Sequence, residues 1–154
     1  MRKILGSLAM SLALCAGGNL ALAAEQGSAD EAVAMVKKAE SYIKANGRDK
    51  ALAEFSNPQG KFRDRDLYVM VYDQSGTNLA HGANQKLVGK NLMALKDADG
   101  KLVVKAFLET AFSGAGKGWV DYKWPNPVSK AVEAKSTYVE RYDDFLVGVG
   151  IYKH

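Results

Sequence analysis

The chain has 154 residues, with 21 Lys and Arg against 17 Asp and Glu, so its formal net charge is +4. This length suits one domain built around a single hydrophobic core. Because charges of both signs are interspersed and the net charge is small, the composition argues against nucleic acid or an anionic membrane as a partner.

Residues 1–23 have the three-part organisation of a cleavable secretory signal. Arg2 and Lys3 form a positively charged start, residues 4–14 are mostly apolar, and positions 21–23 read Ala-Leu-Ala, a small-x-small cleavage site. We expect cleavage after Ala23, with Ala24 as the alternative. The apolar run is shorter than the about 20 residues that a membrane span needs, so an uncleaved anchor is less favoured.

Cleavage leaves residues 24–154 as one domain, expected to be soluble in the bacterial periplasm with no direct membrane anchor. It removes Cys15, the only cysteine of the chain, so the mature protein has no thiol. Disulfides, cysteine nucleophiles and covalent haem attachment are therefore excluded. Because Arg2 and Lys3 also leave with the signal, the net charge falls to about +2.

The mature chain is predicted to begin with a long helix. Residues 28–31 form a capping box, in which Ser28 and Glu31 bond to each other's backbone N–H groups. The glycine of Asn46-Gly47 ends the helix. Its apolar residues recur at helical spacing, at positions 32, 36, 39 and 43. A shorter helix is predicted for residues 49–55.

From residue 67 onward the pattern favours strands. Strands are predicted for 67–72 and 77–81, joined by a turn at 73–76, and then for 118–124, 131–142 and 145–152. Residues 87–95 are expected to form a loop with one helical turn. A helix is predicted for 101–112, with Val103, Ala106, Phe107 and Thr110 on one face. The order predicts an α+β domain with an antiparallel sheet of about five strands and helices packed on it.

The last predicted strand carries two glycines on one face. Gly148 and Gly150 alternate with apolar residues, so a strip of this sheet face has no side chains. Such a strip lets a ligand or another backbone approach closely, while close packing of a helix is an equally good explanation.

Several motifs, in this order along the chain, resemble the single Cache domain, an extracytoplasmic PAS-like sensor module. The resemblance runs from about Asp30 to the end. The motifs that carry it are Tyr68, Asp73-x-x-Gly76, His81 and Gly89-x-Asn91, then Gly118-Trp119-Val120-x-Tyr122-x-Trp124-Pro125-x-Pro127, Lys135-x-x-Tyr138-Val139 and Gly148-x-Gly150-x-Tyr152.

The resemblance implies a PAS-like central antiparallel sheet, a long N-terminal helix and a small-ligand pocket on one sheet face. In bacterial receptors such domains often recognise small carboxylates. This chain departs from the family at His81-Gly82, where His-Pro is common, and at Phe145, where Trp is common. Receptor versions continue into a transmembrane helix, whereas this chain ends at His154, so we expect a freely secreted domain.

Two basic side chains are the first candidates for ligand contact. Lys135, which matches the Lys-x-x-Tyr motif, would pair its ammonium group with a ligand carboxylate; an exposed surface lysine is the alternative. His81 is expected to donate a hydrogen bond to a ligand oxygen, with a charge that varies near neutral pH. The alternative for His81 is a hydrogen-bonded structural role.

The remaining candidates are aromatic, since a ring with a polar tip provides both an apolar wall and a directed hydrogen bond. Tyr122 and Tyr138 are the expected contacts, and Tyr68 is a weaker candidate. Trp124 shares a strand face with Tyr122, whereas Trp119 lies on the other face. We expect at least one of the two tryptophans to be core.

No metal or cofactor is expected. One internal histidine and no cysteine in the mature chain leave too few ligands for zinc. The segment Asp97-x-Asp99-Gly100 lacks further ligands of a calcium loop and is expected to be a turn with a helix N-cap.

The predicted function is therefore a periplasmic sensor-type domain that binds a small organic acid and acts through a separate membrane receptor or transporter. The alternative is a protein-interaction module without a small-molecule ligand. An enzyme is the least favoured, because no motif pairs a nucleophile with a base and no glycine-rich phosphate loop leads from a strand into a helix. The ligand, the partner and the oligomeric state do not follow from the sequence.

Overall fold

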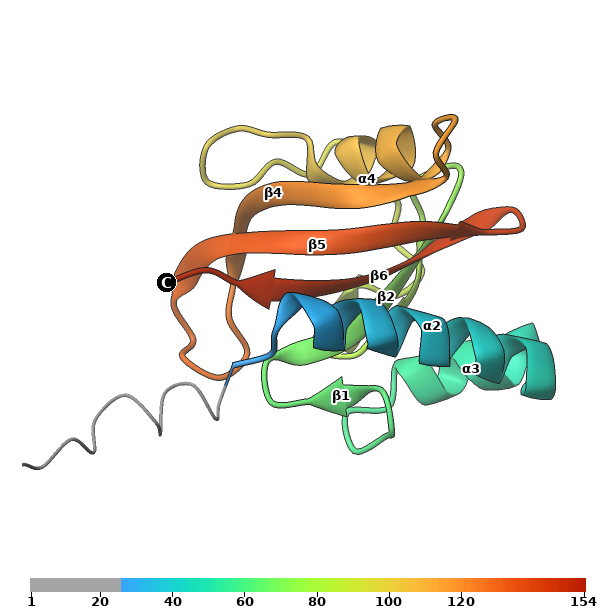
Figure 1. The fold of residues 1–154 in the computed structure, drawn as a ribbon. Helices are drawn as coiled ribbons and strands as arrows, with labels where there is room; N and C mark the ends of the chain where they lie inside the picture. The colour runs from blue at the N-terminus through green and yellow to red at the C-terminus, as the bar shows by residue number, and fades with distance from the viewer. Residues whose placement is uncertain (1–25) are drawn as a thin grey trace, which may run out of the picture.

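A computed structural model describes residues 26–154, and the expected secretory signal with its two cleavage sites lies outside them. The described chain forms an α+β domain in which helices cover both faces of one antiparallel sheet (Figure 1). This confirms the predicted fold class. None of the helices within residues 26–154 has the length and apolar character required to cross a membrane.

The N-terminal helix α2 (Ala29–Asn46) begins and ends as the sequence predicts. The Ser28 hydroxyl accepts from the Glu31 N–H at 3.2 Å, and the Glu31 carboxylate accepts from the Ser28 N–H at 2.7 Å. Gly47 has φ of +85°, a conformation that favours glycine, and it joins α2 to α3 (Arg48–Phe55). Both helices lie on one side of the sheet (Figure 1).

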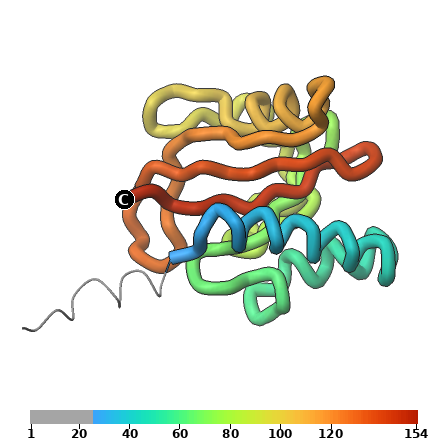
Figure 2. The backbone as a smooth tube through the Cα atoms, in the orientation of Figure 1, coloured from blue at the N-terminus to red at the C-terminus, as the bar shows by residue number. Residues whose placement is uncertain are grey.

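The sheet has the strand order β1-β2-β6-β5-β4, and β3 pairs with β2. All pairings are antiparallel. The last strand therefore lies in the middle of the sheet, between β5, which precedes it directly in the chain, and β2, which comes from much earlier in the chain (Figure 2). The strands are β1 (Arg63–Asp64), β2 (Leu67–Asp73), β3 (Asn78–His81), β4 (Lys117–Pro125), β5 (Val132–Tyr142) and β6 (Phe145–Tyr152).

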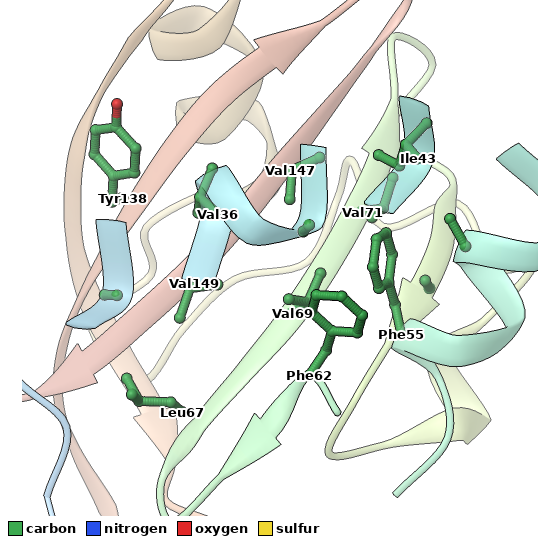
Figure 3. Packing of buried hydrophobic residues seen from close by; sticks show 14 of the residues in the cluster. Val36, Ile43, Phe55, Phe62, Leu67, Val69, Val71, Tyr138, Val147 and Val149 are labelled. Atoms are coloured by element: carbon green, nitrogen blue, oxygen red, sulfur yellow. The ribbon is translucent and has the colours of Figure 1, made fainter. Parts of the chain in front are cut away.

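Two hydrophobic clusters fill the two faces of this sheet. The first packs α2 and α3 against alternate residues of β2 and β6, including Val69, Val71, Val147 and Val149 (Figure 3). The second packs α4 (Val103–Ala111) against the opposite face, around Leu146. The alternation of side chains along β6 thus divides the core into two layers.

The structure corrects several predicted details. Val104 and Ala111 are buried in α4, whereas Ala106 and Thr110, expected on the inner face, are only partly buried. The helix also begins at Val103, after the expected start, and the sheet lies over a row of the helix next to the expected one. The short strand β1 was not predicted, and the helical turn η1 (Gln85–Leu87) comes before most of the expected loop.

The Asp97 segment is a turn, as expected. Its carboxylate accepts from the backbone N–H groups of Asp99 and Lys101, at 3.0 and 2.8 Å. It does not cap the following helix, because the N-cap position of α4 is Leu102. Among residues 26–154 no group of three or more His, Cys, Asp or Glu side chains could hold a metal ion.

Candidate ligand-binding site

The glycine strip of β6 is filled by side chains of the neighbouring strand. A Cβ atom at Gly150 would overlap Cε of Lys135 and Oγ1 of Thr137, both on β5. A Cβ at Gly148 would lie 3.3 Å from Cγ2 of Thr137 and from Cγ1 of Val139. The atoms nearest to these two positions are therefore mainly β5 side chains, joined at Gly150 by the backbone oxygen of Ser136 at 3.3 Å and at Gly148 by Cγ of Met70 at 3.5 Å. The function of the strip is to let Lys135 lie flat across β6.

Lys135 is enclosed by tyrosines from three strands. Its side chain is 1% exposed, and Nζ donates to the hydroxyl of Tyr68 at 2.7 Å. Nζ also lies 4.1 Å from the ring centroid of Tyr68, 4.7 Å from that of Tyr152 and 5.9 Å from that of Tyr122. The alternative of an exposed surface lysine is excluded.

The charge of Lys135 has no close counter-ion. Within residues 26–154 no carboxylate oxygen lies within 4.0 Å of Nζ. A cation–π contact contributes about 0.5–2 kcal/mol, whereas burying an ion costs several kcal/mol. Burial therefore lowers the pKa of Lys135 well below its ordinary value, and the charge of Asp66 opposes this shift only in part.

His81 is held as a neutral imidazole. It is 1% exposed, and its Nδ1 accepts from the backbone N–H of Asn84 at 2.9 Å and of Ala83 at 3.3 Å. Burial, with a smaller contribution from Lys135, lowers the pKa of His81 to about 3. The expectation that its charge varies near neutral pH is therefore wrong. With Nδ1 acting as acceptor, the proton is on Nε2, which remains a hydrogen-bond donor.

Two cavities meet at His81. The outer one is a cleft of about 230 Å³ at the surface, whose wall includes Tyr68, Trp124 and Asn126. The inner one has room for about one water molecule, with a volume of about 10 Å³, and lies against α4 between Met70, Phe107 and Tyr122. His81 and Trp124 line both cavities, so they stand between the surface cleft and the interior.

Five of the seven predicted residues are brought together here. Tyr68, His81 and Trp124 line the cleft, Lys135 bonds to the Tyr68 hydroxyl behind it, and Tyr122 lies further in. The Tyr122 hydroxyl and Oγ1 of Thr137 share a hydrogen bond of 2.8 Å. The ring centroids of Tyr68 and His81 lie 5.0 Å apart.

Tyr138 and Trp119 lie on the other face of the sheet. Tyr138 belongs to the cluster beneath α2 (Figure 3), and its hydroxyl donates to Glu140 at 2.7 Å. Trp119 is 40% exposed, with its ring centroid 5.5 Å from that of Tyr138. The expectation that Lys135 and Tyr138 line one cavity is wrong, because residues three apart in a strand point to opposite faces.

The sequence reasoning missed two residues of the site. Tyr152 pairs with Lys135 across β5 and β6, and its hydroxyl donates to the Pro125 carbonyl at 2.8 Å and lies 3.5 Å from the Tyr68 hydroxyl. The sequence signal that could have identified Tyr152 is its position after two glycines on the same face of the strand.

Asp66 is the second residue that the sequence reasoning missed. One of its carboxylate oxygens accepts from the Gly27 N–H at 2.7 Å, while the other, Oδ2, is buried without a partner among residues 26–154.

Comparison with known proteins assigns the chain to a family. Residues 2–154 match the family described as Single Cache domain 2. The sensor histidine kinase MctS of Rhizobium johnstonii is 34% identical over 90 residues, or 57% of this chain, and the methyl-accepting chemotaxis protein McpP of Pseudomonas putida is 31% identical over 91 residues, or 58%. The matched regions make up 19% and 16% of those two proteins, so the chain spans less than a fifth of each.

Solved structures show the same fold. A methyl-accepting chemotaxis protein from Vibrio parahaemolyticus superposes with a TM-score of 0.68 at 30% identity, over 80% of this chain and 86% of that one. The periplasmic sensor domain of a chemotaxis protein gives 0.64 at 26% identity, over 81% and 90%. A Cache chemosensory domain studied for carboxylic acid recognition gives 0.63 at 24% identity, over 79% and 85%.

Proposed function

Because this chain belongs to the single Cache domain 2 family, whose members are extracytoplasmic, non-catalytic sensor modules, we propose that it binds a small carboxylate in the cleft beside His81. The buried amine of Lys135 is the observation that carries this proposal. It lies beneath the cleft without a carboxylate partner among residues 26–154, and a ligand carboxylate is the counter-charge that would complete it.

The polar groups of the cleft fit such a ligand. Nε2 of His81 is a donor. The Tyr68 hydroxyl already accepts from Lys135, and within residues 26–154 its proton makes only the long 3.5 Å contact to the Tyr152 hydroxyl, so a ligand oxygen could accept it instead. A carboxylate that accepts from both would approach Lys135 through the Tyr68 hydroxyl. Trp124 forms an apolar wall for the rest of the ligand. The cleft of about 230 Å³ suits a molecule of a few carbon atoms.

One solved neighbour is itself a Cache domain that recognises carboxylic acid. At 24% identity this likeness bears on the fold, so the argument for this chain rests on Lys135 and its surroundings. The wider role is also proposed: with the secretory signal removed, the domain would act in the periplasm and pass its bound state to a separate membrane receptor or transporter.

Thermal unfolding of the protein purified from the periplasm tests the proposal. Acetate, propionate, lactate and pyruvate are each compared with the matching neutral amide, which has the same shape but no charge. An acid that fits raises the melting temperature in a saturable way, because it binds only the folded state. At an acid concentration of 100 times Kd, the free energy of unfolding should increase by about 2.7 kcal/mol. Lys135→Met should abolish the shift. A response equal for acids and amides, or none to any acid, would contradict the proposal and favour the interaction module, for which the exposed Trp119 is the candidate contact.

A further inference from the structure

We propose that an anionic ligand enters this site together with one proton, which Lys135 takes up, so that binding weakens as the pH rises. The inference rests on the proposed function and concerns its regulation. It makes the domain sensitive to the concentration of the ligand and of protons at the same time.

The surroundings of Lys135 are organised to hold a neutral amine. The single hydrogen bond that Nζ makes within residues 26–154 goes to a phenol, the Tyr68 hydroxyl, at 2.7 Å. The other groups around Nζ are the rings of Tyr122 on β4 and Tyr152 on β6, with the backbone of Gly150 beneath the aliphatic chain. A side chain that is 1% exposed has almost no access to water, which would otherwise solvate an ammonium group.

The titratable groups that face Lys135 from the other elements do not provide a full negative charge to balance an ammonium group. Burial raises the pKa of Tyr68, Tyr122 and Tyr152, so these side chains stay neutral phenols. His81 on β3 is also neutral, because its pKa is about 3. Among residues 26–154, Asp66, just before β2, is the acidic group whose charge acts on the amine, and its own pKa is raised by burial.

A ligand carboxylate changes this balance. An opposite charge beside the amine favours the ammonium form, so the pKa of Lys135 rises when the ligand binds. A group that holds a proton in the complex but not in the free protein makes binding proton-linked. Between the pKa values of the free and the bound state, affinity falls about tenfold for each unit of rising pH. Propionate itself is ionised near neutral pH and above, so in that region the proton comes from the solvent.

Calorimetric titration of the periplasmic protein with propionate tests this linkage. At a single pH near 8, the titration is carried out in Tris and in HEPES, whose ionisation enthalpies differ. Uptake of about one proton makes the observed heats differ by about the difference between those two enthalpies. Over about pH 7 to pH 9, Kd should rise along the predicted slope. Equal heats in both buffers together with a flat Kd would overturn the inference.

Two variants identify the proton acceptor. Lys135→Arg carries its charge at every pH, so its binding of propionate should be independent of the buffer. His81→Asn removes the other buried base. Because His81 is also a proposed donor to the ligand, propionate should bind this variant more weakly, but each molecule bound should still be accompanied by about one proton. Uptake that disappears in His81→Asn but persists in Lys135→Arg would overturn the assignment to Lys135.

NMR of the unsubstituted protein tests the same point even if the Lys135→Arg variant does not fold. The NMR shifts of the Lys135 side-chain Nζ and Cε report its charge directly, and they should change from amine to ammonium on addition of propionate near pH 8. A free protein whose Lys135 is already charged at about pH 9 would overturn the inference. Failure of the proposed function looks different, because no binding heat would then appear at any pH.

Discussion

Gly150 and Lys135 share one volume across the β5–β6 pair, since the space of the missing glycine side chain contains the aliphatic chain of the lysine. The lysine can lie flat, and its amine reaches the Tyr68 hydroxyl, because β6 has no Cβ at that point. The position of the lysine amine in the proposed site is thus set by a residue without a side chain.

Gly150→Ala should therefore displace Lys135. The added methyl group overlaps Cε of Lys135 and Oγ1 of Thr137, and overpacking of this kind costs about 1–3 kcal/mol. We expect a lower midpoint in urea unfolding and loss of the propionate-induced thermal shift. Gly148→Ala is the matched control, since its Cβ would meet side-chain atoms at 3.3 Å, a tight contact that a small shift of those side chains relieves and that does not involve Lys135. Equal effects of the two substitutions on propionate binding would contradict this role of Gly150.

Lys135→Met should separate stability from binding. Replacing a buried amine by an apolar side chain of similar length removes a desolvation cost, so the free protein should be unchanged or more stable by about 1–2 kcal/mol. Carboxylate binding should be lost. Chemical unfolding with and without propionate measures both quantities. Lys105→Met, at an exposed position on α4, is the control and should change neither by more than about 0.5 kcal/mol.

Two tyrosine-to-phenylalanine substitutions distinguish the two sheet faces. Tyr68→Phe removes the acceptor of the Lys135 amine and a donor of the cleft, so carboxylate binding should weaken at least about tenfold. Tyr138→Phe removes a hydrogen bond to Glu140 beneath α2 and should cost about 1 kcal/mol of stability while the Kd stays the same. Isothermal titration of both variants measures this. A weakened Kd in Tyr138→Phe would show that the α2 face takes part in binding.

His81 should make the domain sensitive to acid. Its pKa is about 3 in the folded protein and 6.5 in the unfolded chain, so below pH 6.5 the unfolded chain binds the additional proton. The stability associated with neutral His81 is complete above pH 6.5 and is lost as the pH falls toward 3, at about 1.4 kcal/mol per unit.

The difference in unfolding free energy between the protein and His81→Asn, measured from about pH 7 down to about pH 4, isolates this contribution from that of the carboxylates. The difference should shrink steadily as the pH falls. A constant difference would mean that His81 titrates alike in both states.

The periplasmic protein should begin at Ala24 or at Glu25, depending on whether cleavage follows Ala23 or Ala24. Intact mass spectrometry of the purified protein decides between them. A chain that still starts at Met1 would show that the first residues are retained, and the proposed release into the periplasm would then be wrong.

Local rules were sufficient to predict most of the fold from the sequence. The capping box at Ser28 and the glycine after Asn46 define α2 through contacts within a few residues, and both are confirmed. The alternation of side chains along a strand also predicted that Tyr122 and Trp124 share one face, and in the structure both line the inner cavity. Such features depend on neighbours in the chain, which a single sequence displays.

The site was harder to predict because it depends on pairing between distant strands. Lys135 and Tyr138 were grouped by a shared motif, although their odd spacing sends them to opposite faces. The low pKa of His81 comes from burial, which no local pattern states. Asp66 reaches Gly27 across 39 positions of sequence, and nothing near either residue marks that contact.

The central position of β6 has a consequence for how the site can fail. Lys135 on β5 meets tyrosines of β2, β4 and β6, so the amine is enclosed only when all of these strands are paired in their present register. A slip of one residue between β5 and β6 would turn Lys135 out of its enclosure and bring a side chain to the place of Gly150. A misaligned sheet would thus lose the proposed ligand site outright, and binding competence would report correct assembly of the whole sheet.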